Sequence, residues 1–259
     1  ALVADLGKEI RATVVRQSDG SYNVFVGNGQ PVVVGKTTFS LMAAPSLEDP
    51  QRMEVGYKSG ATTVLLGPST LQGGNLGGLL AFRSETLDST QNALGRVAIG
   101  IAESFNNQHN LGQDLNGVLG VQNGDFFTVA SPGVLPRSGN TGTATVSATL
   151  QDVSALTTSD YQLQYAGVQN INVAGVPTLH SIFVLTRMSD STATTIPIPV
   201  GAAGAWGVTV DGINVTIAPG AAGTDAWMIQ PTRSGARDIA VALKDPAGIA
   251  AASPVRTAA

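Results

Sequence analysis

An apolar residue recurs every seven positions in the middle of this chain, and this repeat restricts the fold more than any other feature. The repeated residues are Leu80, Leu87, Leu94 and Ile101, and Gln91, Ala98 and Phe105 lie four positions after members of the series. This spacing places side chains on one face of an α-helix. The repeat therefore predicts one long helix from Leu76 to His109, weakened or kinked by Gly77, Gly78, Gly95 and Gly100.

The apolar seam of this helix, formed by Leu80, Leu87, Leu94 and Ile101, has two interpretations. It is either an ordinary stripe facing the core or a surface that packs against helices outside the given sequence. A seven-residue repeat suits packing against another long helix, but the only other helical pattern is the short one from Leu2 to Ile10. We favour the second interpretation in part, and expect Leu94→Asp in a full-length parent protein to block assembly.

The residues before the long helix have the pattern of short strands. Two turn signals, Asp19-Gly20 and Asn28-Gly29, separate three short apolar runs between residues 13 and 34. Asp-Gly and Asn-Gly supply the positive φ angles of tight hairpins, so a three-stranded meander is predicted there. Further strands are expected at 53–57 and 62–66.

Beyond Asn116-Gly117 no long helical period continues, and Thr, Val, Gly and Ser dominate. Strands are expected at 161–165, 182–186, 206–210 and 213–217, with Asp211-Gly212 joining the last two in a type I′ hairpin. These elements favour a mainly antiparallel β sandwich or barrel. The fold class is therefore α+β, with a partial helical domain and small meander at 1–115 and an outer β domain at 116–259.

A weak internal repeat is also visible in the second region. Asp125 to Val129 with Pro132 resembles Asp225 to Ile229 with Pro231. Each phrase is followed by a second shared one, Leu150-Gln151-Asp152 in the first copy and Leu243-Lys244-Asp245 in the second. The first copy is expected to open the β domain and the second to close it.

Composition excludes several classes of partner. The net charge is −4 with only 12% charged residues, and the sequence has no basic run interleaved with aromatics, so nucleic acid and anionic membranes are poor partners. With no cysteine, disulfides and thiolate chemistry are excluded. No apolar stretch is long enough to span a membrane, and no signal peptide is visible. Because the chain opens at Ala1 inside a helix and ends in a weakly structured stretch at 255–259, we expect a piece of a longer protein.

No catalytic, cofactor-binding or metal site is predicted. His109 and His180 fall in different expected domains without metal-ligand spacing, so both are interpreted as structural. The sequence lacks the GxSxG pattern of a nucleophilic serine, although a spatial triad leaves no sequence signature. The glycine run at 73–78 could hold an anion at a helix N-terminus, but it lacks P-loop and dinucleotide spacing; a flexible start to the helix is the better interpretation.

Other polar and aromatic candidates also favour structural roles. Four carboxylates stand beside Ser, Thr or Gly and are interpreted as turn residues: Asp152, Asp160, Asp190 and Asp211. No EF-hand pattern is present, and the sequon Asn214-Val215-Thr216 is a short match that a bacterial source would make meaningless. Core packing is the favoured explanation for Trp206, Trp227 and Tyr165, which would be the contact residues of a binding module.

Several phrases, in order along the chain, resemble the flagellar hook-associated protein 1 family, the junction proteins between hook and filament. They include Leu2 to Gly7 leading into Thr13-Val14-Val15, Gly27 to Pro31, Gly73 to Leu80 with Phe82-Arg83, Asn92 to Gly95, Phe105 to His109, Gly112 to Gly117 and Gly139 to Gly142. The resemblance weakens between about Gln164 and Pro199.

This resemblance implies a structural role. Members of the family polymerise through terminal helical bundles and project β domains outward, so the given sequence would hold part of the helical domain and one outer domain. The implied partners are further copies in a ring, the hook protein and the second junction protein, at a secreted, extracellular flagellum; the piece alone is expected to be monomeric. The alternatives are an adhesin or carbohydrate-binding β sandwich, and a surface hydrolase with clustered acids.

Overall fold

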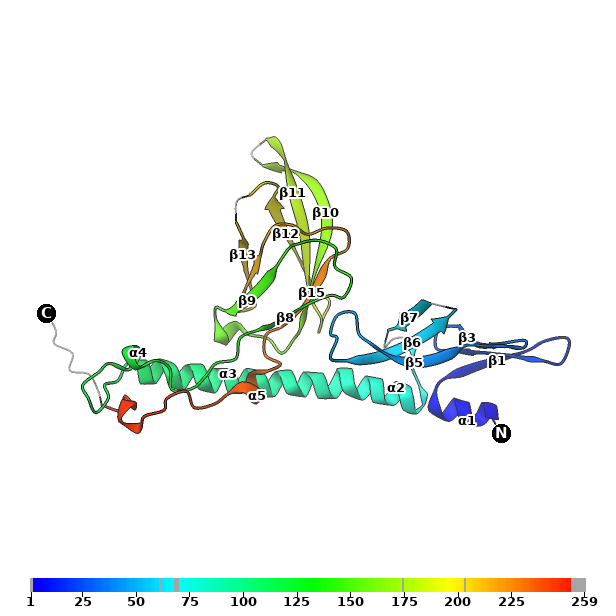
Figure 1. Ribbon diagram of the computed structural model, residues 1–259, viewed down its shortest axis with the longest axis horizontal. Helices are drawn as coiled ribbons and strands as arrows, with labels where there is room; N and C mark the ends of the chain where they lie inside the picture. Colours follow the sequence, from blue (N-terminus) through cyan, green and yellow to red (C-terminus); the bar gives the residue numbers. More distant parts are fainter. Residues whose placement is uncertain (1, 61, 68–69, 174, 203, 253–259) are drawn as a thin grey trace. The chain divides into compact units, whose positions relative to one another are not determined.

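The computed structural model describes all residues of the chain except 1, 61, 68–69, 174, 203 and 253–259. It divides into two compact units, Ala1–Asp88 and Ser89–Ala259, which we describe separately (Figure 1). This division falls inside the first of the two expected domains, and the expected boundary near residue 115 stays a prediction. The expected weak structure at 255–259 lies outside the described residues.

The first unit contains helix α1 (Leu2–Glu9) and two small antiparallel sheets. The first sheet has the order β1 (Ala12–Arg16), β2 (Tyr22–Val26), β3 (Gln30–Val34), β4 (Thr37–Thr38). The second has the order β5 (Ser40–Pro45), β6 (Met53–Ser59), β7 (Thr62–Leu66). The predicted meander and the strands at 53–57 and 62–66 are confirmed, whereas β4 and β5 were not predicted.

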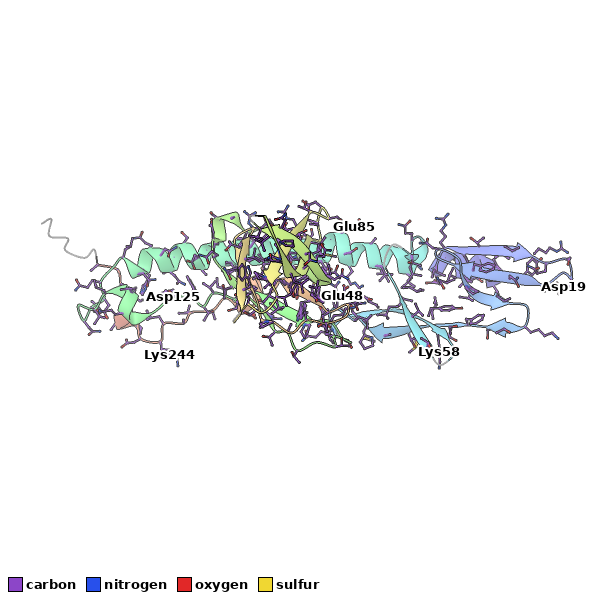
Figure 2. All side chains as sticks on the ribbon, turned by 90° about the horizontal axis from the view of Figure 1, so that it is seen from above. Asp19, Glu48, Lys58, Glu85, Asp125 and Lys244 are labelled. Carbon is purple, nitrogen blue, oxygen red and sulfur yellow. The ribbon has the colours of Figure 1, made fainter. Side chains whose placement is uncertain are left out.

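Glycines with positive φ angles form the meander's turns. Gly20 has φ 84° and Gly29 has φ 102°, a region in which residues with a Cβ are strained. Asp19 lies at the tip of the β1–β2 hairpin (Figure 2) and accepts hydrogen bonds from the amide and hydroxyl of Ser21. The Asp-Gly and Asn-Gly signals thus locate both turns as the sequence predicted.

The core of the first unit draws on both sheets and on helix α2 (Gly74–Ala81). Its buried side chains are Ile10, Val26, Tyr57, Leu66, Leu71 and Leu80. Leu80, the first member of the predicted seam, is therefore a core residue. The Tyr57 hydroxyl donates to the Pro31 carbonyl at 2.9 Å, which satisfies its polar end.

The predicted long helix is present, but with an irregular segment at a place without glycine. Helix α2 continues into a π-helical segment, η2 (Phe82–Leu87), and then into α3 (Asp88–Asn110). In η2 the Ser84 hydroxyl donates to the carbonyl of Leu80 at 3.1 Å. A wider turn in which a side chain bonds the helix backbone is a known cause of helix irregularity, and this irregular segment lies at η2, whereas Gly95 and Gly100 lie within the α-helical segment α3.

The second unit is a β sandwich standing beside α3 (Figure 1). One sheet has the order β12 (Ala193–Pro199), β11 (Val176–Arg187), β10 (Tyr161–Val173), β15 (Ala226–Gln230), β8 (Gly133–Pro136). The other has the order β13 (Trp206–Val210), β14 (Ile213–Ile217), β9 (Val146–Leu150). All pairings are antiparallel, and the two sheets do not join into a closed barrel, so of the two predicted architectures the sandwich is confirmed.

Side chains from both sheets form one core. Tyr161, Leu163, Phe183, Leu185, Trp227 and Ile229 come from the larger sheet, and Ala148, Ile213, Val215 and Ile217 from the smaller. The predicted β13–β14 hairpin matches to the residue, and its turn residues Asp211 and Gly212 have φ 47° and 78°, as a type I′ turn requires.

The remaining elements of the second unit are short, and they show where the internal repeat holds. They are α4 (Gly120–Asn123), η3 (Val153–Ala155), α5 (Gly235–Asp238) and η4 (Pro246–Gly248). Asp152 caps η3 by accepting from the Ser154 amide, and Asp245 caps η4 by accepting from the Ala247 amide, so the second shared phrase forms the same local structure twice. The first phrase does not: 225–229 enters strand β15, whereas 125–129 makes only an isolated bridge through Phe127.

Candidate functional site on helix α3

The face of α3 that packs on its own unit is polar and small. Its buried residues are Asn92, Gly95, Ala98, Ile99, Ala102, Asn106 and His109, which we call the inner stripe. Only Ile99 is a large apolar side chain, and it joins the sandwich core. At 3.6 residues per turn, this stripe lies roughly a third of a turn away from the apolar seam that the sequence shows.

Besides the apolar contact of Ile99, hydrogen bonds attach the inner stripe. The Asn92 amide group donates to the Thr158 carbonyl and to the Asp160 carboxylate, each at 3.1 Å. Asn106 donates to the Phe127 carbonyl at 2.9 Å and accepts from the Phe127 amide at 2.8 Å, as a neighbouring strand would. Such bonds fix position along the helix axis, because a shift would leave buried polar groups unpaired.

Two further contacts complete the attachment. His109 Nε2 accepts from the amide of Ala250 at 3.1 Å. At Gly95 the helix backbone approaches Thr232 and Gly235 so closely that an added Cβ would lie 2.8 Å from the Thr232 carbonyl carbon. The inner stripe therefore holds α3 to the returning C-terminal segment as well as to the loop before β10.

The opposite character appears on the solvent side of α3. Leu94, Val97, Ile101 and Phe105, which we call the outer stripe, are 57%, 59%, 56% and 44% exposed. Leu87 of the predicted seam, in η2, is 52% exposed as well. Apart from Leu80, the predicted seam is thus a surface of the described chain, which agrees with the second interpretation of the sequence.

A helix with polar residues inside and apolar residues outside is inverted relative to an ordinary surface helix. Contiguous exposed apolar residues of this kind mark interaction surfaces. One end of the outer stripe is already ordered by aromatic contacts, because the ring of Phe105 lies 4.7 Å from that of Phe126 and 5.2 Å from that of Phe127. The outer stripe is the strongest candidate for a functional site in the described chain.

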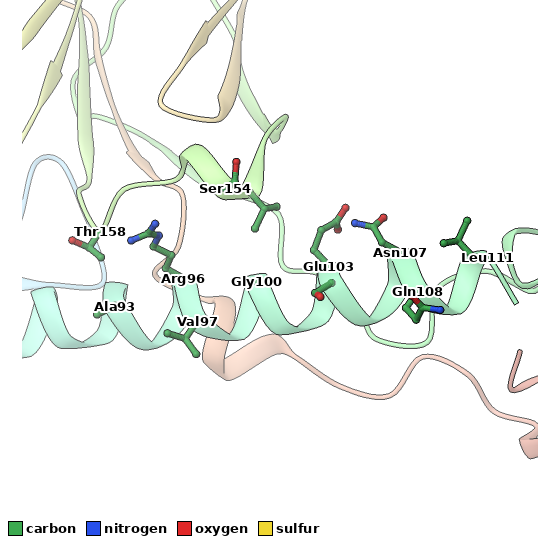
Figure 3. Close-up of a pocket in the computed structure, with 12 residues that line it drawn as sticks. Ala93, Arg96, Val97, Gly100, Glu103, Asn107, Gln108, Leu111, Ser154 and Thr158 are labelled. Carbon is green, nitrogen blue, oxygen red and sulfur yellow. The ribbon is translucent and has the colours of Figure 1, made fainter. Parts of the chain in front are cut away.

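An open groove runs along α3 beside the outer stripe (Figure 3). Its volume is about 680 Å³, and its floor includes Ala93, Val97, Gly100 and Leu111 of the helix and the loop after it. Val153, Ser154 and Thr158, from η3 and the loop that follows, line it on the sandwich side. Val97 belongs to both the groove and the outer stripe, so the two form one continuous surface.

The candidate sites from the sequence do not come together. His180 lies in β11 and binds the Thr178 carbonyl through Nδ1 at 3.0 Å, whereas His109 serves the inner stripe. Among the described residues no three His, Asp or Glu side chains are grouped so that they could hold a metal ion.

Within the glycine run at 73–78, Gly74 and Gly77 pack closely on neighbouring backbone, and the flexible start that we expected stays a prediction. An added Cβ on Gly74 would lie 2.6 Å from the backbone of Glu9 and Ile10, so the start of α2 packs directly on the end of α1. The Glu9 carboxylate accepts from the side chain of Asn75 at 3.2 Å. The N-terminus of α2 thus faces a carboxylate of its own chain, which disfavours an external anion there.

Two of the four candidate carboxylates are turn residues, as predicted. The Ser154 hydroxyl and amide bind Asp152 and lower its pKa, and the Thr192 amide does the same for Asp190. For Asp160 and Asp211 the turn interpretation is incomplete. Asp160 pairs with Arg233 and with Asn92 of α3, and Asp211 belongs to a network inside the sandwich.

That network joins three residues far apart in the sequence. Arg187 donates three hydrogen bonds to the Asp211 carboxylate, from Nε at 2.9 Å and from Nη2 at 2.7 and 2.6 Å, and the Tyr161 hydroxyl donates to Oδ2 at 2.7 Å. Burial, together with the neighbouring Asp211 carboxylate, raises the pKa of Tyr161 to about 12. The same carboxylate raises the pKa of Arg187.

The sequence did not indicate the structural role of Asp225, because no motif marks this carboxylate. Asp225 is 1% exposed and accepts from the amides of Thr141, Gly142 and Ala222. Burial opposes the charge, but the three amides outweigh it and the pKa of Asp225 is lowered. It therefore closes the loop before β15.

The three aromatic candidates differ in how exposed they are. Trp227 is 3% exposed and Tyr165 packs against the core, as expected, whereas Trp206 is 43% exposed, so core packing does not explain it. The sequon residue Asn214 lies within β14, where its side chain bonds the hydroxyl groups of Thr209 and Thr216. None of the described helices is both long and apolar enough to cross a membrane.

Two family models match the chain. Residues 1–127 match the flagellar hook-associated protein FlgK helical domain, and residues 135–231 match the D2-like domain of flagellar hook-associated protein 1. The first model includes the whole of α3 and its outer stripe.

Similar full-length proteins carry the same description. The chain is 34% identical over 253 residues to flagellar hook-associated protein 1 of Escherichia coli, and 34% identical over 254 residues to that of Salmonella typhimurium. The solved structure of the flagellar hook junction protein FlgK from Burkholderia pseudomallei matches with a TM-score of 0.83 at 33% identity. In each case 97% of this chain is covered, but the chain spans only 42–43% of the other protein.

Proposed function

The chain belongs to the flagellar hook-associated protein 1 family, and we propose that it serves as part of the junction between the hook and the filament of a bacterial flagellum. The observation that carries this proposal is the inverted helix α3. Its inner stripe attaches the β sandwich, and its outer stripe offers apolar side chains to other helices.

In this proposal the outer stripe is covered by helices of the assembled protein. Because these four side chains are already about half-buried, covering the rest contributes roughly 1 kcal/mol each, about half the value for full burial, before the entropy lost on association. A contiguous exposed apolar surface of this kind is typical of a protein interaction site, so the outer stripe would form one part of a larger helix contact.

The β sandwich then acts as a projection held at one position along the helix. Asn92 and Asn106 are fourteen residues apart on α3, and each bonds a different loop of the second unit. Two polar anchors of this kind oppose sliding along the helix axis, so the sandwich would move with the helix that carries it.

The proposed partners and location follow from the family. The full-length protein would assemble into a ring of identical copies, contact the hook protein and the second junction protein, and lie outside the cell on the flagellum. Its role would be mechanical rather than enzymatic. Family membership weighs against the adhesin alternative, and of its three aromatic candidates, Trp206, Trp227 and Tyr165, Trp206 alone is exposed.

The test is complementation of a strain from which the parent gene is deleted. The deletion is expected to leave hooks without filaments in electron micrographs, and the full-length protein to restore filaments and swimming. Full-length protein carrying Leu94→Asp should not restore them, because a carboxylate would be buried in the helix contact.

A matched control replaces another exposed apolar residue away from α3. Val173 in β10 is 51% exposed, and Val173→Asp should restore filaments normally. Normal flagella in the deletion strain would reject the junction role, and normal filaments with Leu94→Asp would reject the outer stripe as the assembly surface.

A further inference from the structure

Helix α3 has few charged residues, and the two that follow Asp88 at its start lie on the same side of the helix. Apart from His109, Arg96 and Glu103 are the only ionisable side chains between Ser89 and Asn110. Both line the groove beside the outer stripe. Figure 3 shows them on the same side of α3, toward the segment that carries Ser154, while Val97 points away from that side.

Neither charged side chain has a partner among the described residues. Among the residues that the structure describes, Arg96 and Glu103 make no ion pair or hydrogen bond, whereas Arg187, Arg233 and Arg237 each pair with a carboxylate. Seven residues of helix separate them by about 10.5 Å along the axis, which is too far for them to pair with each other. An apolar groove is therefore edged by one free positive and one free negative charge.

The shape of the groove indicates what would fill it. It follows α3 from Ala93 to Leu111, and its floor is low at Gly100, where an added Cβ would meet nothing within 4 Å. The backbone groups of α3 are already paired within the helix, so an extended strand would find no hydrogen-bonding edge there. A second helix, whose backbone is self-satisfied, fits such a surface.

We propose that this groove binds one amphipathic α-helix that carries a carboxylate facing Arg96 and a basic side chain facing Glu103, one heptad apart, and that these two pairs fix the direction of the helix. Flanking charges set orientation in paired helices because the reversed arrangement places like charges together. A parallel helix would carry the acid first, and an antiparallel helix the base first. This inference rests on the docking surface proposed above and specifies the chemistry of its occupant.

The experiment measures binding of three designed helical peptides to the complete 259-residue chain by fluorescence anisotropy. The peptides share one apolar stripe and differ at two flanking positions seven residues apart: Glu with Lys, Lys with Lys, or Glu with Glu. The unaltered chain should prefer the first peptide. Arg96→Glu should bind the Lys/Lys peptide about three- to tenfold more tightly than the unaltered chain does, and Glu103→Arg should do the same for the Glu/Glu peptide.

Two controls separate this result from general electrostatics and from misfolding. Lys244→Glu makes the same change of charge at an exposed position outside the groove, labelled in Figure 2, and should leave all three affinities unchanged. Gly100→Leu fills the floor of the groove and should abolish binding of every peptide while tryptophan fluorescence shows a folded sandwich.

Several outcomes would overturn the proposal: no measurable binding of the Glu/Lys peptide, equal affinities for all three peptides, or the same shift with Lys244→Glu. Dimerisation of the unaltered chain that Arg96→Glu abolishes would show that the groove takes a second copy instead. If charge preference is absent while Leu94→Asp still blocks filament attachment, this inference fails and the junction role stands. If the charges select peptides but cells lacking the parent gene make normal flagella, the junction role fails and this inference stands.

Discussion

The substitution of glycine by alanine should have opposite effects on stability at two positions of α3. Alanine in place of glycine stabilises an exposed helix interior by about 1 kcal/mol. At Gly100 an added Cβ would meet nothing within 4 Å, so Gly100→Ala should raise the free energy of unfolding by about that amount. At Gly95 the Cβ would lie 2.8 Å from the carbonyl carbon of Thr232 and 3.4 Å from the amide of Gly235, and both obstacles are backbone.

The clash at Gly95 should outweigh the gain in helix propensity. Forcing extra volume into a close-packed contact costs about 1 to 3 kcal/mol, and more where the neighbours cannot move. We expect Gly95→Ala to lower the free energy of unfolding by about 2 kcal/mol, which separates it from Gly100→Ala by about 3 kcal/mol.

Urea unfolding followed by tryptophan fluorescence measures this difference. The chain has only two tryptophans, Trp206 and Trp227, and both lie in the second unit, so the signal reports the unit that contains both glycines. Equal stability of the two alanine variants, or a more stable Gly95→Ala, would refute the close attachment of α3 to the segment around Thr232.

Three further predictions concern the second unit. The pKa of Asp225 is lower in the folded chain than the unfolded value of about 3.9. The stability that this carboxylate contributes is therefore present above about pH 3.9 and is lost as the pH falls through the folded pKa. The urea midpoint of the unaltered chain should fall more steeply in acid than that of Asp225→Asn. The pKa of Tyr161 is about 12 in the folded chain, whereas an unfolded phenol ionises near pH 10. The stability that the protonated hydroxyl contributes is therefore lost as the pH rises from about 10 to 12. Ultraviolet titration should show a tyrosine that ionises near pH 12 and is absent in Tyr161→Phe. Asn106→Leu leaves the Phe127 amide and carbonyl unpaired and should lower the free energy of unfolding in urea by about 2 to 4 kcal/mol. Asn107→Leu, at an exposed position, should change this free energy little. Equal effects of the two substitutions would contradict the anchor role of Asn106.

The sequence predicts the β elements well where turn chemistry is local. The β13–β14 hairpin and the meander are located correctly because Asp-Gly and Asn-Gly encode their own backbone angles. Strand β5 was not predicted because Ser40–Pro45 lacks both alternation and β-branched residues. The Tyr161–Asp211–Arg187 network was not predicted because its members lie on three elements, brought together only by the sandwich.

For helix α3 the sequence predicts the element but not its orientation. A heptad of Leu and Ile is normally taken to face the core, yet here the inward positions are Asn92, Gly95 and Asn106, which no apolar pattern reveals. Their contribution comes from hydrogen bonds and close backbone approach, both of which depend on distant segments. In the proposed assembly, a helix outside the given sequence covers this exposed heptad.

The most direct test of this account is the accessibility of residue 94 before and after assembly. Because the 259-residue chain has no cysteine, Leu94→Cys gives it a single thiol, and Ser138→Cys in an exposed turn gives a matched control. Residue 94 should react rapidly with a maleimide in the 259-residue chain and become protected in flagella that contain the full-length protein, while residue 138 stays reactive in both. Equal reactivity of residue 94 in the two states would contradict the assignment of the outer stripe as the surface through which the junction assembles.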